Sequence, residues 1–289
     1  MEQELELERK LDKTGKLDLN GIYNNPDPRE YYSTLDLLDY SVPQEAQRYF
    51  RKILATHRET TGRDATKVVD LGCSYGVNAA LLKCGMTLPQ LYGLYRDEST
   101  AGLDRDALIR RDRGIYETAA SPGLEVVGVD CADRALAYAV EASILDDAVA
   151  ADFESEKPAG RHRQALDSAD LIISTGCVGY ISERTIARTL DACGDTRPWM
   201  AHFVLRMFPY APIQEMLAAR GYVTARGTRP VRQRRFACAQ EREQVLDRLA
   251  DQGIDGSGLE YDGWYYADLY VSRPRCDADL VTAQELVEP

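Results

Sequence analysis

Histidine is scarce in this 289-residue chain, and its cysteines lack the spacing of a metal site. The three histidines are His57, His162 and His202, and none has a cysteine or a second histidine close by at the spacing of zinc ligands. The seven cysteines are odd in number, and no two form a Cys-x-x-Cys pair. We therefore expect reduced, mostly buried thiols, a reducing compartment and no metal centre.

Long apolar runs are also missing. No stretch approaches the roughly 20 apolar residues that a membrane-spanning helix needs. The first ten residues, MEQELELERK, are charged and lack the apolar core of a secretory signal. We therefore expect a cytoplasmic protein without a membrane partner.

The formal net charge of −12 opposes nonspecific binding to the phosphates of nucleic acid. We expect no nucleic-acid partner. A local excess of positive charge, interpreted as a solvated loop, consists of Arg226, Arg229, Arg232, Arg234 and Arg235.

Strand-like and helix-like patterns alternate from residue 67 onward. Strands are predicted at 67–71, 124–130, 148–152, 170–175 and 199–208, and helices at 77–85, 132–142, 183–193 and 213–219. This alternation indicates βαβ units and a parallel sheet. Two later strands at 222–225 and 265–273, with a helix at 241–253, fit an antiparallel edge.

The N-terminal segment carries many aromatic rings for a tail. Residues 16–43 contain turn formers together with several tyrosines, and a segment of this kind rarely stays disordered. We expect it to dock on the body as a cap, followed by a helix at 44–60. The chain is divided accordingly into a tail and cap at 1–60 and an α/β domain at 61–289.

The connection between the first predicted helix and the second strand is longer than a simple crossover needs. Residues 86–123 are therefore expected to form an insertion with its own helix. We expect it to serve as a packing element or a subunit contact rather than a catalytic lid, which leaves a homodimer open.

A glycine-rich turn, Asp70-Leu71-Gly72-Cys73-Ser74-Tyr75-Gly76, follows the first predicted strand. Gly72 permits backbone conformations that a side chain would forbid, and Gly76 allows close packing of the helix start. Parallel α/β sheets bind ligands at this carboxyl edge. Asp130 ends the second strand, where its carboxylate can accept hydrogen bonds from a ribose diol or cap the following helix.

The segment VVDLGCSYG resembles the first motif of class I S-adenosylmethionine-dependent methyltransferases, acidic-x-Gly-x-Gly-x-Gly, although Ser74 replaces the middle glycine. The likeness covers roughly residues 65–210 in ordered motifs. It implies a Rossmann-like methyltransferase fold with a seven-stranded sheet, and S-adenosylmethionine as cofactor. A dinucleotide is disfavoured because the turn lacks Gly-x-Gly-x-x-Gly.

The resemblance also implies a set of cofactor contacts. The methionine portion would lie at Asp70, Gly72 and Gly76 with Cys73 and Ser74, the ribose at Asp130 with Cys131, the adenine at Asp152 and Phe153, and the sulfonium near Thr175 and Gly176. Asp152 has the alternative of an ordinary loop acid.

Methyl transfer requires an aligned nucleophile held out of water, so no single catalytic residue type is obligatory. The catalytic candidates are Tyr180, just past the fourth strand, and Arg206, late in the fifth. Tyr180 has the alternative of packing in a loop, Arg206 that of pairing with a structural acid, and His202 is assigned to the core. Expected substrate contacts are Tyr23, Tyr31, Tyr32, Phe208 and Tyr210.

Three functions follow from this pattern. The first is a methyltransferase that acts on a small organic molecule. The second is a non-methylating enzyme that cyclises S-adenosylmethionine to azetidine-2-carboxylate and methylthioadenosine, because residues 16–40 are faintly similar to that synthase branch. The third is a non-catalytic binding protein.

Overall fold

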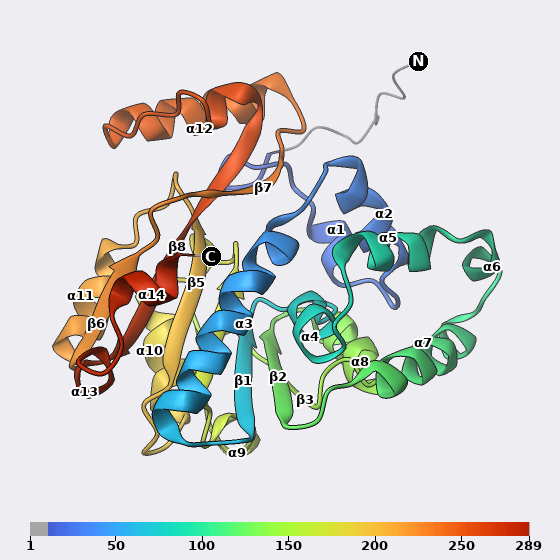
Figure 1. Ribbon diagram of the computed structural model, residues 1–289. Helices are drawn as coiled ribbons and strands as arrows, with labels where there is room; N and C mark the ends of the chain where they lie inside the picture. Colours follow the sequence, from blue (N-terminus) through green and yellow to red (C-terminus); the bar gives the residue numbers. More distant parts are fainter. Residues whose placement is uncertain (1–10, 289) are drawn as a thin grey trace.

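The computed structural model describes residues 11–288, which form a single mixed sheet flanked by helices (Figure 1). The strand order is β3-β2-β1-β4-β5-β8-β6, and β7 also pairs with β8. The strands are β1 (Thr66–Leu71), β2 (Leu124–Asp130), β3 (Asp147–Ala150), β4 (Leu171–Thr175), β5 (Trp199–Leu205), β6 (Tyr222–Arg226), β7 (Val231–Arg235) and β8 (Trp264–Pro274). Strands β1 to β5 pair in parallel, and β8 runs antiparallel to its three neighbours. The predicted doubly wound, mostly parallel sheet is confirmed, with eight strands in the described residues instead of seven.

Successive apolar residues of the strands belong to opposite faces of the sheet and build one core on each face. Val68 of β1 belongs to the cluster beneath α3 (Val42–Thr61), α4 (Val77–Lys83) and α8 (Asp133–Glu141). Val69 belongs to the cluster beneath α9 (Arg161–Leu166), α10 (Glu183–Ala192) and α11 (Ala211–Ala219). Helices on both faces explain why the central strands are nearly continuously apolar.

The remaining helices lie outside these two layers. They are α1 (Asn20–Tyr23), α2 (Arg29–Leu37), α5 (Leu88–Arg96), α6 (Glu98–Ala101), α7 (Arg105–Ala119), α12 (Ala239–Asp251), the 3₁₀ helix η1 (Glu260–Asp262), α13 (Arg275–Ala278) and α14 (Ala283–Val287). Within residues 11–288, none of the helices combines the length and the apolar character that crossing a membrane would demand.

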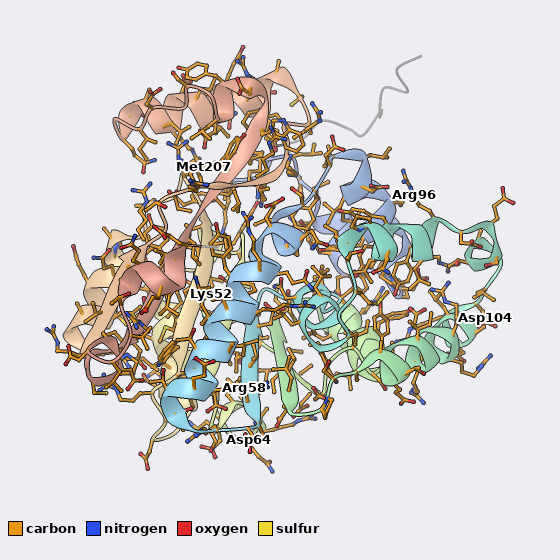
Figure 2. The ribbon with its side chains drawn as sticks, viewed as in Figure 1. Lys52, Arg58, Asp64, Arg96, Asp104 and Met207 are labelled. Atoms are coloured by element: carbon orange, nitrogen blue, oxygen red, sulfur yellow. The ribbon has the colours of Figure 1, made fainter. Side chains whose placement is uncertain are left out.

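The N-terminal cap docks against the insertion, as Figure 1 shows for α2 and α5. The ring of Tyr32 stacks on that of Tyr95 with centroids 4.5 Å apart. Arg96, labelled in Figure 2, pairs with Asp36 of α2 at 2.5 Å. The expected docking of residues 16–43 is confirmed, and the insertion serves as a packing element for the cap.

Of the five clustered arginines, three lie in strand β7, while Arg226 ends β6 and Arg229 lies in the connection between the two strands. Arg234 is buried, and its guanidinium donates to the two carboxylate oxygens of Glu241 in α12 at 2.6 and 3.0 Å. The register of β7 against β8 shifts between Arg232 and Arg235, and such an irregularity redirects side chains. The interpretation as a solvated loop was wrong for Arg234, because the sequence does not show the buried acid that faces it, whereas the other four arginines are exposed.

The Arg234–Glu241 pair provides a test of this part of the fold. Glu241→Gln should lower the free energy of unfolding by about 3–5 kcal/mol, because a buried guanidinium would lose its counter-ion. Urea denaturation measures the change. Arg235→Gln is the matched control: its side chain and its partner Asp39 are exposed, so the loss should stay within about 1 kcal/mol. Similar losses in the two variants would contradict the structural role of the buried pair.

Candidate functional site

A cavity of about 390 Å³ lies at the carboxyl ends of β1, β2 and β4, beneath the N-terminal cap. From the sheet edge it is lined by Leu71, Gly72, Ser74, Val129, Asp130, Cys131, Ala132, Ala151, Asp152, Phe153, Thr175, Gly176, Cys177, Tyr180, Ile181 and Thr185. From the cap and β7 it is lined by Asp12, Lys16, Leu17, Leu19, Asn20, Tyr23, Asn24, Tyr31, Leu35, Tyr40, Gln233 and Arg234. Because β1 lies between β2 and β4, the strand order reverses at this point, which is where open α/β sheets bind ligands.

The loop after β1 is held in an unusual backbone conformation. Gly72 has φ +68°, and a Cβ added there would lie 2.6 Å from the Cβ of Cys177. Ser74 has φ 47°, a left-handed conformation that side chains disfavour. Its amide donates to Asp130 Oδ2 at 2.8 Å, while the amide of Ala132 donates to Oδ1 at 3.0 Å. Asp130 therefore joins this loop to the start of α8 and also lines the cavity.

Two buried oxygens on the cavity wall lack a protein partner among the described residues. They are Ser74 Oγ, in the loop after β1, and Gln233 Oε1, in β7. A buried polar atom without a hydrogen bond costs about 1–3 kcal/mol. Both residues line the cavity, while the two oxygens themselves are buried.

Asp70 lies behind the cavity and does not line it. Its two carboxylate oxygens accept from Asn78 Nδ2 at 3.0 and 3.3 Å, and the same amide nitrogen is 3.1 Å from Thr175 Oγ1. Burial raises the pKa of Asp70 to about 7. The side chain therefore links β1, α4 and β4, while its backbone places the glycine turn.

The residues after β2 and β3 reach the cavity as expected. Cys131, Asp152 and Phe153 all line it, and Phe153 is buried. Asp152 also accepts from the amide of Glu154 at 2.9 Å and from Ser155 Oγ at 2.9 Å. Asp152 therefore caps its own loop, as the alternative interpretation expected, and it also lines the cavity.

Tyr180 connects the loop after β4 to the cap. Its hydroxyl donates to Asp12 Oδ2 at 2.7 Å, and Thr14 Oγ1 donates to Asp12 Oδ1 at 2.7 Å. Thr175 and Gly176 line the cavity beside it. The predicted position of Tyr180 at the site agrees with the structure, and its hydroxyl has a carboxylate partner.

Several predicted site residues lie elsewhere. Arg206 pairs with Glu260 at 2.5 Å and donates to Asp255 O at 2.7 Å, so the structural-acid alternative is the one observed. Tyr210 stacks on Tyr270 with centroids 4.1 Å apart, outside the cavity. Both residues were expected at the cavity but lie outside it, because the sequence does not show which neighbours flank the end of β5.

Other predicted contacts are one layer removed from the cavity. Tyr32 is buried against Tyr95, Phe208 packs against Gly179, and Cys73 and Gly76 are buried behind the lining. Of the five predicted substrate contacts, Tyr23 and Tyr31 line the cavity.

His202 lies in the core, as expected. Its Nδ1 is 2.8 Å from Ser174 Oγ, and burial lowers its pKa to about 4.

The sequence analysis missed several polar or aromatic residues of the cavity wall, among them Asp12, Lys16, Tyr40, Gln233 and Arg234. These five come from the cap or from β7, where no local sequence pattern marks a residue as part of a cavity wall. Lys16 is 7% exposed, and burial together with the positive charge of Arg234 lowers its pKa to about 7.

No protein-family model matches the chain, and no curated protein matches it. Among solved structures it is similar to the plantazolicin methyltransferase BpumL in complex with SAH, at 11% identity over 89% of this chain and 93% of that chain, with a TM-score of 0.44. It is also similar to magnesium protoporphyrin IX methyltransferase (ChlM) from Synechocystis PCC 6803 with bound SAM, at 12% identity, 78% and 79% coverage and a TM-score of 0.40. A third is the [4+2]-cyclase SpnF, at 16% identity, 80% and 82% coverage and a TM-score of 0.39. Since all three TM-scores lie below 0.5, function is inferred from the residues of the cavity itself.

The raised pKa of Asp70 predicts a specific pH dependence of stability. The native state keeps a proton on Asp70 that the unfolded chain releases near its ordinary pKa of 3.8, so this residue makes stability fall as the pH rises from about 4 to about 7. Asp70→Asn removes this contribution. Urea denaturation from pH 4 to 8 should show a variant whose stability relative to the wild type improves with pH, by up to about 1.4 kcal/mol per pH unit. Parallel stability curves would contradict the buried, protonated carboxyl.

Proposed function

We propose that the cavity binds S-adenosylmethionine and that the protein is a transferase that moves its methyl group to a small organic acceptor held beneath the cap. The observation that carries this proposal is the arrangement around Asp130. Its carboxylate ends β2, lines the cavity and fixes the left-handed Ser74 loop at the end of β1. An acid and a glycine-rich loop on adjacent parallel strands suit the ribose and the amino-acid portion of one nucleoside.

The residues on the cavity wall fit the chemical groups of this ligand. Asp130 offers a ribose partner, and Asp152 with Phe153 offers a polar group and an apolar ring for a base. Ser74 and Gln233 add polar side chains to the same wall for the amino-acid portion. The bound cofactor would supply an electrophilic carbon attached to a cationic sulfur.

The aromatic residues of the cavity suit that positive charge. Tyr23, Tyr31, Tyr40 and Tyr180 all line it, and aromatic faces attract cations. The cap covers the cavity and limits the access of water to the reacting atoms. Positioning and desolvation are the main contributions that a protein makes to an in-line displacement.

The acceptor is proposed to be small because the cavity is small. Its volume of about 390 Å³ is at the lower end of the roughly 300–1,000 Å³ typical of ligand pockets. Asp12, from the cap, and Asp130, from the sheet, bring negative charge to the wall, which disfavours a polyanionic substrate.

The same small volume supports a second candidate, in which S-adenosylmethionine reacts with itself. The lone pair of its α-amine would form a bond to the γ-carbon as the bond from that carbon to sulfur breaks. The products would be azetidine-2-carboxylate, methylthioadenosine and a proton. This reaction needs no room for a second substrate.

Removal of the Asp130 carboxylate tests the binding site. Asp130→Ala should weaken S-adenosylmethionine binding about 10- to 100-fold, because hydrogen bonds involving a charged group contribute roughly 1.5–3 kcal/mol. Isothermal titration calorimetry measures the affinity, and circular dichroism verifies folding. Asp147→Ala, at the opposite end of the neighbouring β3, is the control and should bind as the wild type does. Unchanged affinity in folded Asp130→Ala would refute the proposed site.

Product analysis separates the candidate reactions. The purified protein should convert S-adenosylmethionine to S-adenosylhomocysteine only when a small-molecule fraction of cell extract is added as the acceptor source. Mass spectrometry with and without that fraction measures the products. Methylthioadenosine formed from S-adenosylmethionine alone would establish the cyclisation instead. Binding without turnover under either condition would contradict both enzymatic proposals.

A further inference from the structure

Lys16 is a buried lysine on the wall of the cavity. It lies in a tight turn of the cap, where Leu11 and Leu17 form an antiparallel bridge and Asp12 N donates to Lys16 O at 2.7 Å. The amide of Leu17 donates to Glu241 Oε1 at 2.6 Å and fixes the turn against α12. Lys16 is therefore held in place by backbone contacts on both of its sides.

Aromatic rings flank the amine of Lys16. Its Nζ lies 5.2 Å from the ring centroid of Tyr180, in the loop after β4, and 5.6 Å from that of Tyr265 in β8. Tyr23 of α1 lines the same cavity. These rings replace water around the amine and leave the cavity as the side from which a ligand can approach.

The charged groups near Lys16 are engaged with other partners. Arg234 of β7 is paired with Glu241 of α12, so this carboxylate acts on Lys16 only through space and not as a direct partner. Asp12 accepts from Tyr180 and Thr14. Among residues 11–288, no carboxylate forms an ion pair with Lys16 Nζ. Burial and the positive charge of Arg234 lower the pKa of Lys16 to about 7, and the negative charges of Glu241 and Asp12, which raise it, offset only part of this shift.

We propose that Lys16 is the general base of this cavity, and that it takes a proton from an amine nucleophile, which enters as an ammonium ion beside Asp12 and the hydroxyl of Tyr180. This assignment rests on the proposed function and narrows its substrate to amines. An amine must lose a proton before its lone pair can attack, and the neutral Nζ of Lys16 is a cavity-facing acceptor for that proton.

Protons and electrons are conserved in this step. The ammonium gives one proton to Lys16 Nζ, and the nitrogen lone pair then forms the new bond to the carbon. The electron pair of the broken carbon–sulfur bond goes to sulfur, which becomes a neutral thioether. The Lys16 ammonium returns its proton to water when the products leave. Lys16 can accept the proton in this way from a separate amine acceptor or from the α-amine of S-adenosylmethionine itself.

The proton on Lys16 can be followed without any turnover. In protein labelled with ¹³C at the lysine ε-carbons, one resonance should titrate near pH 7, and this resonance should be absent from Lys16→Gln. Lys13→Gln is the matched control, because Lys13 is an exposed lysine in the same turn, and its variant should keep the resonance. A Lys16 resonance that titrates near the ordinary lysine value would overturn the proposal.

Turnover gives the second measurement. Lys16→Gln should bind S-adenosylmethionine within about threefold of the wild type but lose at least about 100-fold in kcat, since general bases contribute roughly 10²–10⁴-fold. The wild-type pH–rate profile should rise through a limb near pH 7 that the variant lacks. Lys16→Arg, which keeps a positive charge but cannot accept a proton, should not restore turnover.

The outcomes separate this proposal from the one on which it rests. If the wild type fails to bind S-adenosylmethionine, the proposed function is wrong, and the resonance titration still shows whether Lys16 is neutral at pH 7. If the wild type turns over and folded Lys16→Gln keeps the same kcat and the same pH limb, the general-base assignment is wrong while the proposed function stands. Should Lys16→Gln fail to fold, Lys16→Met replaces it in the turnover measurement.

Discussion

One buried ion pair fixes the part of the cap that carries Lys16. The two carboxylate oxygens of Glu241 accept from the guanidinium of Arg234 and from the backbone amides of Leu17 and Ala237. One side chain therefore fixes β7, α12 and the turn that carries Lys16. Removing two charges from water costs several kcal/mol each, and only complete pairing offsets this cost. Because both oxygens have partners, this turn of the cap is joined to β7 and α12 without an unpaired buried charge.

A second set of contacts holds the other side of the cap. Tyr32 stacks on Tyr95 of the insertion, and the hydroxyl of Tyr95 donates to the buried Asp112 at 2.6 Å. Tyr138 of α8 donates to the same carboxylate at 2.5 Å. The insertion thus connects the cap to a helix whose start is fixed by Asp130. The walls of the cavity belong to separate parts of the chain, yet they are linked by buried hydrogen bonds.

The sequence was sufficient to predict the parallel core, because β-branched runs and helical patterns report directly on local structure. Strand β2 was predicted with its observed bounds, and the loops after β1, β2, β3 and β4 meet as expected. The strand β7 was missed, since Val-Arg-Gln-Arg-Arg carries no apolar alternation and is stabilised by its neighbours. The structural pairing of Arg206 could not be read from the sequence for the same reason, because the acid that pairs with it, Glu260, is 54 residues away in the chain. Residues whose burial depends on distant partners leave no local signal.

Burial shifts the pKa of an acid, Asp70, and that of a base, Lys16, toward the same value. It raises the pKa of Asp70 and lowers that of Lys16, in each case to about 7, because a low-dielectric environment disfavours either charged form. A cation bound in the cavity, with Lys16 on its wall and Asp70 behind it, would act on the two groups in the same direction. It favours the ionised carboxylate of Asp70 and the neutral amine of Lys16, so both groups release protons as the cation enters. Binding of a sulfonium would therefore strengthen as the pH rises through 7, and it would prepare Lys16 in the form that can accept a proton.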